Sequence, residues 1–436
     1  MPRGERVTGT RRGGTLRGAV GFGVAVALGL TLLTGCSGGG SGGGRWQGGS
    51  GGTGGQGGTP SPTGPQVTAM VSVPGAEENK VSTAVEISYS SELADKATIE
   101  VKDAAGAAVK GGLRQGADDT AGVWVPAKQL KYGATYTATV TATAADGQTN
   151  TATSTFTTMA KPSKTISVSS FLGENQVVGV AMPIIIRFSR SIPKSYRDDV
   201  QKRMWVTADE PVTGIWRWAS GTEVRFRPEK YWKANTKISY RIATGGLALG
   251  DGYFGRNDLT VDVKIGSELI MTVENKTKHM TVKKDGKVLR SIPISLGKPS
   301  TPSSSGTMVI IQKLRHTIFD TYDELGPEDG YRTPIDFAQR LTWGGQFIHA
   351  APWSVSSQGR TNVSHGCVNM SMSQAEWLFG VTKMGDPITV KGTTRKLADG
   401  DGWTDWNVSF STFAKGSALP LEEGVKAIVP PTPMES

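Results

Sequence analysis

Residues 364–369 have the sequence Ser-His-Gly-Cys-Val-Asn, and this hexapeptide is the most informative stretch of the 436-residue chain. Its cysteine, Cys367, is one of two in the chain, and His349, one of four histidines, lies 18 positions upstream. A lone cysteine with a histidine elsewhere in the sequence is the minimum equipment for thiolate acyl chemistry. The pattern therefore predicts a reactive thiol at Cys367.

The base that would activate this thiol is either His349 or His365, and spacing alone does not choose between them. Side chains two positions apart on an extended segment point the same way, so His365 could face the same side as Cys367. Gly366 would let a substrate carbonyl approach the backbone closely. The amides of Gly366 and Cys367 could then form part of an oxyanion hole.

Two other roles for Cys367 compete with catalysis. A lone cysteine is often an inert buried residue, but the flanking Ser, His, Gly and Asn are not typical of a core. A structural zinc ion needs four ligands, and the only ligand-like pairing in the sequence is that of His365 with Cys367. We therefore expect no metal site and no cofactor.

The first 35 residues have the features of an export signal. Five arginines flank or precede an apolar stretch over residues 19–33, and Leu-Thr-Gly-Cys follows at 33–36. This tetrapeptide resembles a bacterial lipobox, whose cysteine, here Cys36, is acylated and becomes the new N-terminus. The apolar stretch is short for a transmembrane span, which favours a cleaved signal over the alternative of an uncleaved anchor. We expect an exported protein, lipid-anchored at the outer face of the plasma membrane.

Charge and composition narrow the possible partners. Loss of residues 1–35 would remove five Arg and one Glu and lower the formal net charge from +10 to +6. Such a modestly basic chain suits an anionic envelope, and no Lys/Arg run interleaved with aromatic residues indicates nucleic-acid binding.

Residues 36–65 are almost wholly Gly, Ser, Thr, Pro and Gln, and are predicted to be a flexible tether that spans on the order of 30 Å. Lipidation of Cys36 would leave Cys367 as a free thiol, which favours a reactive role.

Residues 66–160 and 161–266 are each predicted to form an immunoglobulin-like β-sandwich. Apolar and polar residues alternate with a period of two in both blocks, for example over 136–142 and 261–265. Residues 130–137 align with 232–239, and a strand is predicted after each, which indicates a repeat. The expected role of both blocks is that of spacers, with wall or partner binding as the alternative.

Residues 267–393 are predicted to form a β-rich domain with one or two helices. We expect a long polar loop or lid over 320–334, a strand over 343–349 that ends at His349, and a helix over 375–381 with a capping box of Ser373 and Glu376. Residues 394–436 are predicted to form a short C-terminal subdomain and tail. Its aromatic residues should pack on a neighbouring domain, and its last dozen residues should be disordered.

The spacing from His349 to residues 364–369 resembles the signature of the L,D-transpeptidases, whose catalytic domain is of the YkuD type. Residues 301–302 and 306–307 resemble the earlier Thr-Pro and Gly-Thr segment of this family. Residues 330–333, 347–353 and 402–407 resemble more narrowly the actinobacterial members. Those members carry a lipid-anchor signal, two immunoglobulin-like domains and a short C-terminal subdomain, so the resemblance implies a mostly β fold of that organisation.

The resemblance also implies a role for each matching residue. Cys367 would be the nucleophile and His349 its base, with the ring oriented by the backbone carbonyl of Ala350. Tyr331, on the lid, would contact the substrate or the oxyanion, and His365 would be structural and hold the loop. The other residues implied to line the substrate site are Gly344, Gly345, Trp353, Ser364 and Asn369. Trp353 could instead be a hydrophobic plug, and Asn369 could simply hydrogen-bond the loop.

The implied activity is cysteine-dependent acyl transfer between peptidoglycan stem peptides in the cell wall. A tetrapeptide donor would lose its terminal D-Ala, and the side-chain amine of a diamino acid in a second stem would accept the acyl group, giving a 3→3 cross-link. Carbapenem β-lactams are implied as covalent inhibitors, and we expect a monomer. The alternatives are an L,D-carboxypeptidase, in which water takes the acyl group, a sortase-like protein transpeptidase, and a non-catalytic wall-binding spacer protein.

Overall fold

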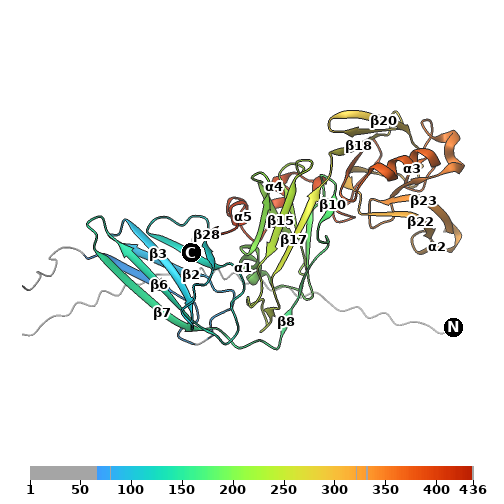
Figure 1. Ribbon diagram of the computed structural model, residues 1–436. Helices are drawn as coiled ribbons and strands as arrows, with labels where there is room; N and C mark the ends of the chain where they lie inside the picture. The colour runs from blue at the N-terminus through green and yellow to red at the C-terminus, as the bar shows by residue number, and fades with distance from the viewer. Residues whose placement is uncertain (1–65, 79, 321, 330–331, 435–436) are drawn as a thin grey trace, which may run out of the picture. The chain divides into compact units, whose positions relative to one another are not determined.

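The computed structural model describes residues 66–78, 80–320, 322–329 and 332–434. The predicted signal, lipidation site and tether over residues 1–65, and Tyr331, lie outside these ranges. In the described part, no helix is both long and apolar enough to cross a membrane. The chain is mostly β, with two sandwiches followed by a third, β-rich block and a C-terminal segment, so the predicted fold class is confirmed (Figure 1).

The first sandwich packs a five-stranded sheet against a three-stranded one. Strand β6 shows why it forms, because its alternating Tyr136, Ala138 and Val140 are buried while the intervening threonines face outward. The two sheets share one core that includes Ile87, Trp124, Ile99, Val140 and Phe156. The first sheet has the order β1 (Thr68–Ser72), β2 (Ile87–Glu92), β5 (Ala121–Pro126), β4 (Gly111–Leu113) and β28 (Thr432–Pro433), and the second has the order β3 (Lys96–Asp103), β6 (Thr135–Thr143) and β7 (Thr149–Thr157).

The second sandwich repeats the topology of the first. The order β9-β11-β14-β13 matches β1-β2-β5-β4, and β12-β15-β17 matches β3-β6-β7. Strands β6 and β15 begin at Thr135 and Lys237, which are equivalent positions in the predicted alignment, so the repeat is confirmed. The elements of this block are β8 (Thr165–Ile166), β9 (Val168–Ser170), β10 (Gln176–Val178), β11 (Ile184–Phe188), η1 (Lys194–Tyr196), α1 (Arg197–Gln201), β12 (Met204–Ala208), β13 (Gly214–Trp218), β14 (Glu223–Pro228), β15 (Lys237–Ile242), β16 (Phe254–Gly255) and β17 (Leu259–Ile265).

The third block, which follows the second sandwich, consists of two sheets and the helix α3 (Met372–Val381). A shared core of apolar side chains, including Met271, Ile292, Ile348 and Leu378, joins the two sheets and the helix. The six-stranded sheet has the order β20 (Lys287–Pro293), β19 (His279–Lys284), β18 (Leu269–Glu274), β26 (Pro387–Lys391), β21 (Ser304–Val309) and β27 (Arg395–Lys396). The four-stranded sheet has the order β22 (Gln312–Asp320), β23 (Arg332–Arg340), β24 (Phe347–Ala350) and β25 (Val368–Met370).

Three sequence-based expectations for this block are wrong in detail. Residues 320–334 are not a long loop, because β22 and β23 extend into them as a hairpin that is joined by helix α2 (Tyr322–Asp329). The strand that ends near His349 begins at Phe347, and residues 343–344 form a turn instead. Helix α3 (Met372–Val381) is capped by Ser371, whose side chain accepts from the Gln374 amide, so the predicted cap at Ser373 is two residues late.

The C-terminal segment packs on the second sandwich, as its aromatic residues predict. The Trp403 ring lies 4.9 Å from the Phe171 ring, edge to face, and the Trp406 indole donates to the Ala181 carbonyl at 2.7 Å. Phe413 is fully buried against Ile215. The helical elements of this segment are η3 (Asp405–Asn407), α4 (Phe410–Ala414) and α5 (Leu421–Ala427).

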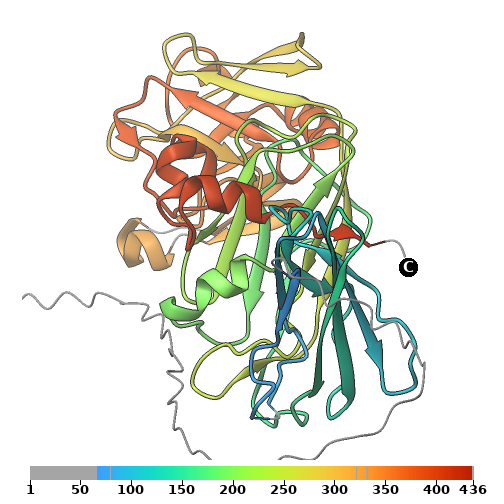
Figure 2. The ribbon, with the colours of Figure 1, turned by 90° about the vertical axis from the view of Figure 1, so that its left-hand side faces the viewer.

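The prediction that the last dozen residues are disordered is wrong for the residues up to Met434. Helix α5 extends to Ala427, and β28 then adds an antiparallel strand to β4 of the first sandwich, with the Met434 amide donating to the Gly111 carbonyl at 3.2 Å (Figure 2). Backbone hydrogen bonds hold this Pro-rich end, and apolar contacts add to them, because Ile428 is buried and Met434 packs against the core of the first sandwich.

Deletion of residues 430–436 is expected to expose the β4 edge of the first sandwich. Each backbone hydrogen bond contributes about 1 kcal/mol, so the deletion should speed amide hydrogen exchange at Gly111–Leu113 without unfolding the block. Exchange measured by mass spectrometry would check this, with the central strand β6 as the internal control. Unchanged exchange in β4 would contradict the pairing.

Candidate active site

The parallel pairing of β24 with β25 brings the two predicted catalytic residues together. Its register places His349 opposite Asn369, so Cys367, which immediately precedes β25, lies beside the start of β24. Both side chains are buried, with 5 % of His349 and 7 % of Cys367 exposed, and both line one cavity of about 460 Å³. A cavity of this size is large enough to hold a short peptide segment.

Burial and one hydrogen bond fix the protonation state of His349. Its Nδ1 lies 2.8 Å from the Ala350 carbonyl oxygen, and a carbonyl can only accept, so Nδ1 carries the hydrogen. Burial lowers the pKa of His349, which keeps the ring neutral at neutral pH. Nε2 therefore has a free lone pair, as a general base requires. The predicted role of the Ala350 carbonyl in orienting the ring agrees with this contact.

Cys367 is a free thiol, and its side chain is buried. Burial raises its pKa to about 12, although a backbone hydrogen bond from Phe347 opposes the rise. The Sγ atom lies 3.8 Å from the Gly345 carbonyl oxygen, towards which the thiol can donate. At neutral pH the site therefore holds a neutral thiol and a neutral imidazole, and a proton must leave the sulfur as it attacks.

The loop before Cys367 is held by its own side chains. Ser364 Oγ donates to the Cys367 carbonyl at 2.8 Å and accepts from the Gly366 amide at 3.1 Å. Gly366 has a φ of 129°, a conformation that favours glycine. Because the Gly366 amide is already bonded to Ser364, its proposed part in an oxyanion hole would require it to exchange this partner.

His365 is a weaker candidate for the base than His349. Its ring is exposed at the rim of the cavity, and its Nε2 lies 3.0 Å from Lys298 Nζ. An ammonium group can only donate, so this contact occupies the Nε2 lone pair. Burial and hydrogen bonding therefore favour His349 over His365 as the candidate base, a choice that spacing left open.

Trp353 and Asn369 form part of the cavity wall. Trp353 is 60 % exposed and its ring lies 6.1 Å from that of His349, so the alternative of a buried hydrophobic plug is wrong. Asn369 Nδ2 lies 3.4 Å from Ser354 Oγ, which fixes the amide. Its Oδ1 is buried and has no hydrogen-bond partner among the described residues.

Several cavity residues were missed by the sequence analysis. They come from the β22–β23 hairpin and from the loop before β25, and they are Phe319, Thr333, Ile335 and Val363. The hairpin register pairs Phe319 with Thr333. The apolar residues Phe319 and Ile335, which flank the polar 320–334 stretch, were the available sequence signal for these cavity residues. Gly344 and Gly345, which were predicted to line the substrate site, are not among the residues that line this cavity. The Gly345 carbonyl oxygen instead lies 3.8 Å from Cys367 Sγ.

Comparison with known proteins shows where this architecture occurs. A family model described as the L,D-transpeptidase catalytic domain matches residues 268–390, and one described as a bacterial Ig domain matches residues 76–248. L,D-transpeptidase 2 of Mycobacterium tuberculosis is 38 % identical over 299 residues, which cover 68 % of this chain and 72 % of the relative. The chain belongs to the L,D-transpeptidase family.

Other members of the family match shorter regions. L,D-transpeptidase 1 of M. tuberculosis is 36 % identical over 219 residues, or 50 % of this chain and 81 % of the relative. A solved structure of an L,D-transpeptidase in complex with imipenem is 33 % identical and covers 53 % of this chain and 100 % of its own, with a TM-score of 0.45.

In the described part of this L,D-transpeptidase chain, no three His, Cys, Asp or Glu side chains are grouped so that they could hold a metal ion.

Alkylation of Cys367 by iodoacetamide is expected to accelerate steadily between about pH 7 and about pH 10. A thiol whose pKa is about 12 gains about tenfold in thiolate per pH unit across this range, whereas an ordinary thiol with a pKa of about 8.5 levels off. Mass analysis of the Cys367 peptide would follow the rate, with glutathione in the same tube as the control. A plateau below about pH 9 would contradict the raised pKa.

Proposed function

We propose that this chain is a peptidoglycan L,D-transpeptidase that forms 3→3 cross-links through a Cys367 acyl-enzyme. The observation that carries the proposal is the shared cavity of Cys367 and His349, in which the His349 ring is buried, neutral and oriented by the Ala350 carbonyl. Family membership supports the acyl-transfer chemistry. No step requires a cofactor.

In the first half-reaction, His349 Nε2 takes the thiol proton as Cys367 Sγ attacks a carbonyl carbon of the donor. That carbonyl belongs to the L-centre of the third residue, a diamino acid, in a tetrapeptide stem. The C–N bond to the terminal D-Ala breaks, and the His349 proton passes to the leaving amine. A thioester between Cys367 and the shortened stem remains, with no net change in the protons of the enzyme.

In the second half-reaction, the side-chain amine of a diamino acid in another stem attacks the thioester. His349 takes the proton that the amine loses and returns it to the departing sulfur, which restores the thiol. The product is an amide between the third residues of two stems.

The location of the enzyme follows from its substrate and its N-terminal sequence. We infer that residues 1–35 are a lipoprotein signal and that acylated Cys36 anchors the chain at the outer face of the plasma membrane. The Gly-rich stretch and the two sandwiches would then hold the catalytic block in the wall. The chain would act as a monomer, without nucleic acid.

Cys367→Ala is expected to abolish release of D-Ala and formation of cross-linked dimer from a purified disaccharide-tetrapeptide. His349→Gln should slow both by about 10²–10⁴-fold, because it removes the general base. Cys36→Ser, which removes the other thiol, is the matched control and should retain full activity. Product masses would distinguish the rivals, since D-Ala release without dimer would indicate an L,D-carboxypeptidase and an inert wild type would indicate a wall-binding spacer.

A carbapenem is expected to acylate the wild-type chain once, at Cys367, because a strained β-lactam carbonyl presents the same electrophile as the donor peptide. Intact-mass analysis should show one adduct, and peptide mapping should place it on the Cys367 peptide. Cys367→Ser, which keeps the size and polarity of the side chain, serves as the control. An adduct on any other residue would contradict the assignment.

A further inference from the structure

The sulfur of Cys367 is faced by one short segment, the turn over residues 341–346 together with the start of β24. The Gly345 carbonyl oxygen lies 3.8 Å from Sγ, and the backbone of Phe347 is also hydrogen-bonded to the thiol. Phe347 is fixed by strand pairing, since it lies opposite Arg340 of β23. Gly345 belongs to the turn itself, has a φ of 82°, and must be held in another way.

The turn is held at its apex by a carboxylate from the C-terminal segment. Asp401 Oδ1 accepts a hydrogen bond from the Gly344 amide at 2.7 Å, and one peptide unit separates this amide from the Gly345 carbonyl. A Cβ atom on Gly344 would lie only 3.2 Å from Asp401 Oδ2, so glycine permits this close approach. Arg340 holds the other side of the turn, because its Nη2 donates to the Trp343 carbonyl at 3.3 Å.

The segment that carries Asp401 lies against the turn at two further points. The Trp403 ring meets the Trp343 ring nearly at right angles, with 6.5 Å between centroids. A Cβ atom on Gly402 would lie 2.8 Å from the Leu341 carbonyl oxygen, which shows how closely the two backbones approach. The packing of Gly402 and Trp403 against the turn therefore places the half-buried Asp401, and its hydrogen bond to the Gly344 amide lies at the surface.

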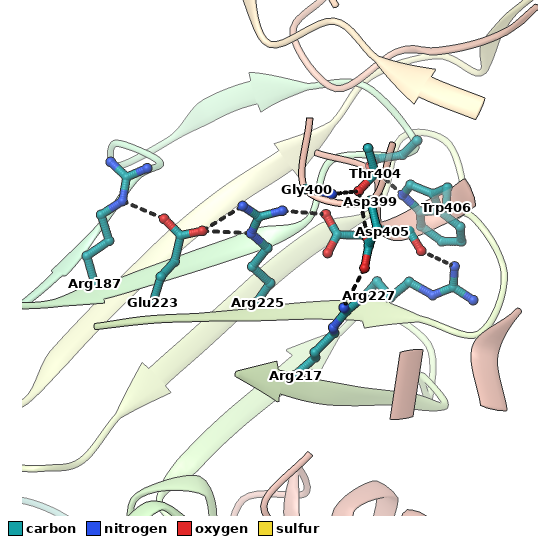
Figure 3. A network of polar contacts seen from close by, with 11 residues as sticks. Arg187, Arg217, Glu223, Arg225, Arg227, Asp399, Gly400, Thr404, Asp405 and Trp406 are labelled. Carbon is teal, nitrogen blue, oxygen red and sulfur yellow. Dashed lines mark hydrogen bonds and ion pairs between the residues drawn. The ribbon is translucent and has the colours of Figure 1, made fainter. Parts of the chain in front are cut away.

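The same segment is anchored on the second sandwich by arginines on both sides of Asp401. Arg217 pairs with Asp399 at 3.2 Å, and Arg225, itself paired with Glu223, reaches the buried Asp405 at 3.2 Å (Figure 3). Arg227 donates to the Asp405 carbonyl at 2.8 Å. Thr404 closes the loop, because its Oγ1 accepts from the Gly400 amide and donates to Asp399.

We propose that Asp401 is a positioning residue for the nucleophile, which sets the Gly345 carbonyl against Cys367 Sγ by holding the Gly344 amide. The carbonyl accepts the thiol hydrogen in the resting site and so restricts the position of the sulfur, and the hydrogen turns from Gly345 to His349 Nε2 when the sulfur attacks. Asp401 itself touches neither the sulfur nor the substrate carbonyl. Through this contact the second sandwich would control the geometry of a reaction that takes place in another block of the chain.

This inference rests on the proposed acyl-enzyme chemistry and predicts a graded response at one position. Asp401→Ala removes the acceptor, so the rate constant for acylation of Cys367 by a carbapenem should fall by about tenfold or more. Asp401→Asn keeps an acceptor oxygen and loses the charge, and should stay within about twofold of the wild type. Asp401→Glu keeps the charge but moves the oxygen by one methylene, and should fall between the two.

The experiment uses the full-length chain and four measurements, of which the melting temperature reports on stability. Stopped-flow or mass-spectrometric kinetics give the acylation rate constant, the final adduct stoichiometry shows whether every molecule is competent, and hydrogen exchange reports on the Gly344 amide. For Asp401→Ala we expect one adduct per chain, a slower rate, faster exchange at Gly344 and an unchanged melting temperature. A merely structural role would lower the melting temperature and the stoichiometry together, and Asp401→Asn would not restore the rate.

Three results would overturn the inference. If the wild type is acylated and Asp401→Ala is acylated at the same rate, Asp401 does not position the nucleophile and the proposed function stands. Equal losses in the Ala and Asn variants would assign the effect to charge and also overturn it. If the wild type is not acylated at Cys367 at all, the proposed function fails and the inference with it.

Discussion

The active site depends on one constraint, the parallel pairing of β24 with β25. Parallel neighbours cannot be joined by a tight turn, and they need a crossover of about a dozen residues or more. Here the crossover runs from Ala351 to Cys367, and it explains why the histidine and the cysteine are 18 positions apart in sequence yet adjacent in the sheet. The ladder hydrogen bonds fix the backbone of His349, and Cys367 directly precedes the paired strand, with its carbonyl held by Ser364 Oγ.

The C-terminal segment also supports the active site, because it contacts all three folded blocks of the chain. It contributes Trp403 and Trp406 to the second sandwich and contacts the turn next to the nucleophile, and its end completes a sheet of the first sandwich. Its main polar anchor is the ion pair between Arg225 and the nearly fully buried Asp405, whose pKa is raised by burial although Arg225 opposes the rise. Loss of one partner of such a buried pair typically costs about 3–5 kcal/mol, because the other charge is left without compensation. The three folded blocks are therefore energetically linked through about 40 residues at the end of the chain.

Features that depend on residues close together in the sequence could be predicted, whereas features that depend on contacts between distant residues could not. The alternation of Tyr136, Ala138 and Val140 predicted a strand because period-2 burial is a local property. The hairpin of β22 and β23 was missed because cross-strand pairing stabilises polar residues such as Asp320 and Arg332, whose own propensities favour a loop. The tail was misjudged for the same reason, since β28 is held by backbone contacts with β4 and not by its own side chains.

The sequence by itself determined the chemistry, because the hexapeptide around Cys367 and its distance from His349 are local patterns that few other sites share. It also determined the two repeated sandwiches, since strand periodicity is written along the chain. Only the tertiary structure distinguishes the two candidate histidines, because the tautomer and pKa of His349 depend on burial and on the Ala350 carbonyl. Only the tertiary structure placed Asp401 beside Gly344, since these residues are 57 positions apart and meet through packing that no local pattern encodes.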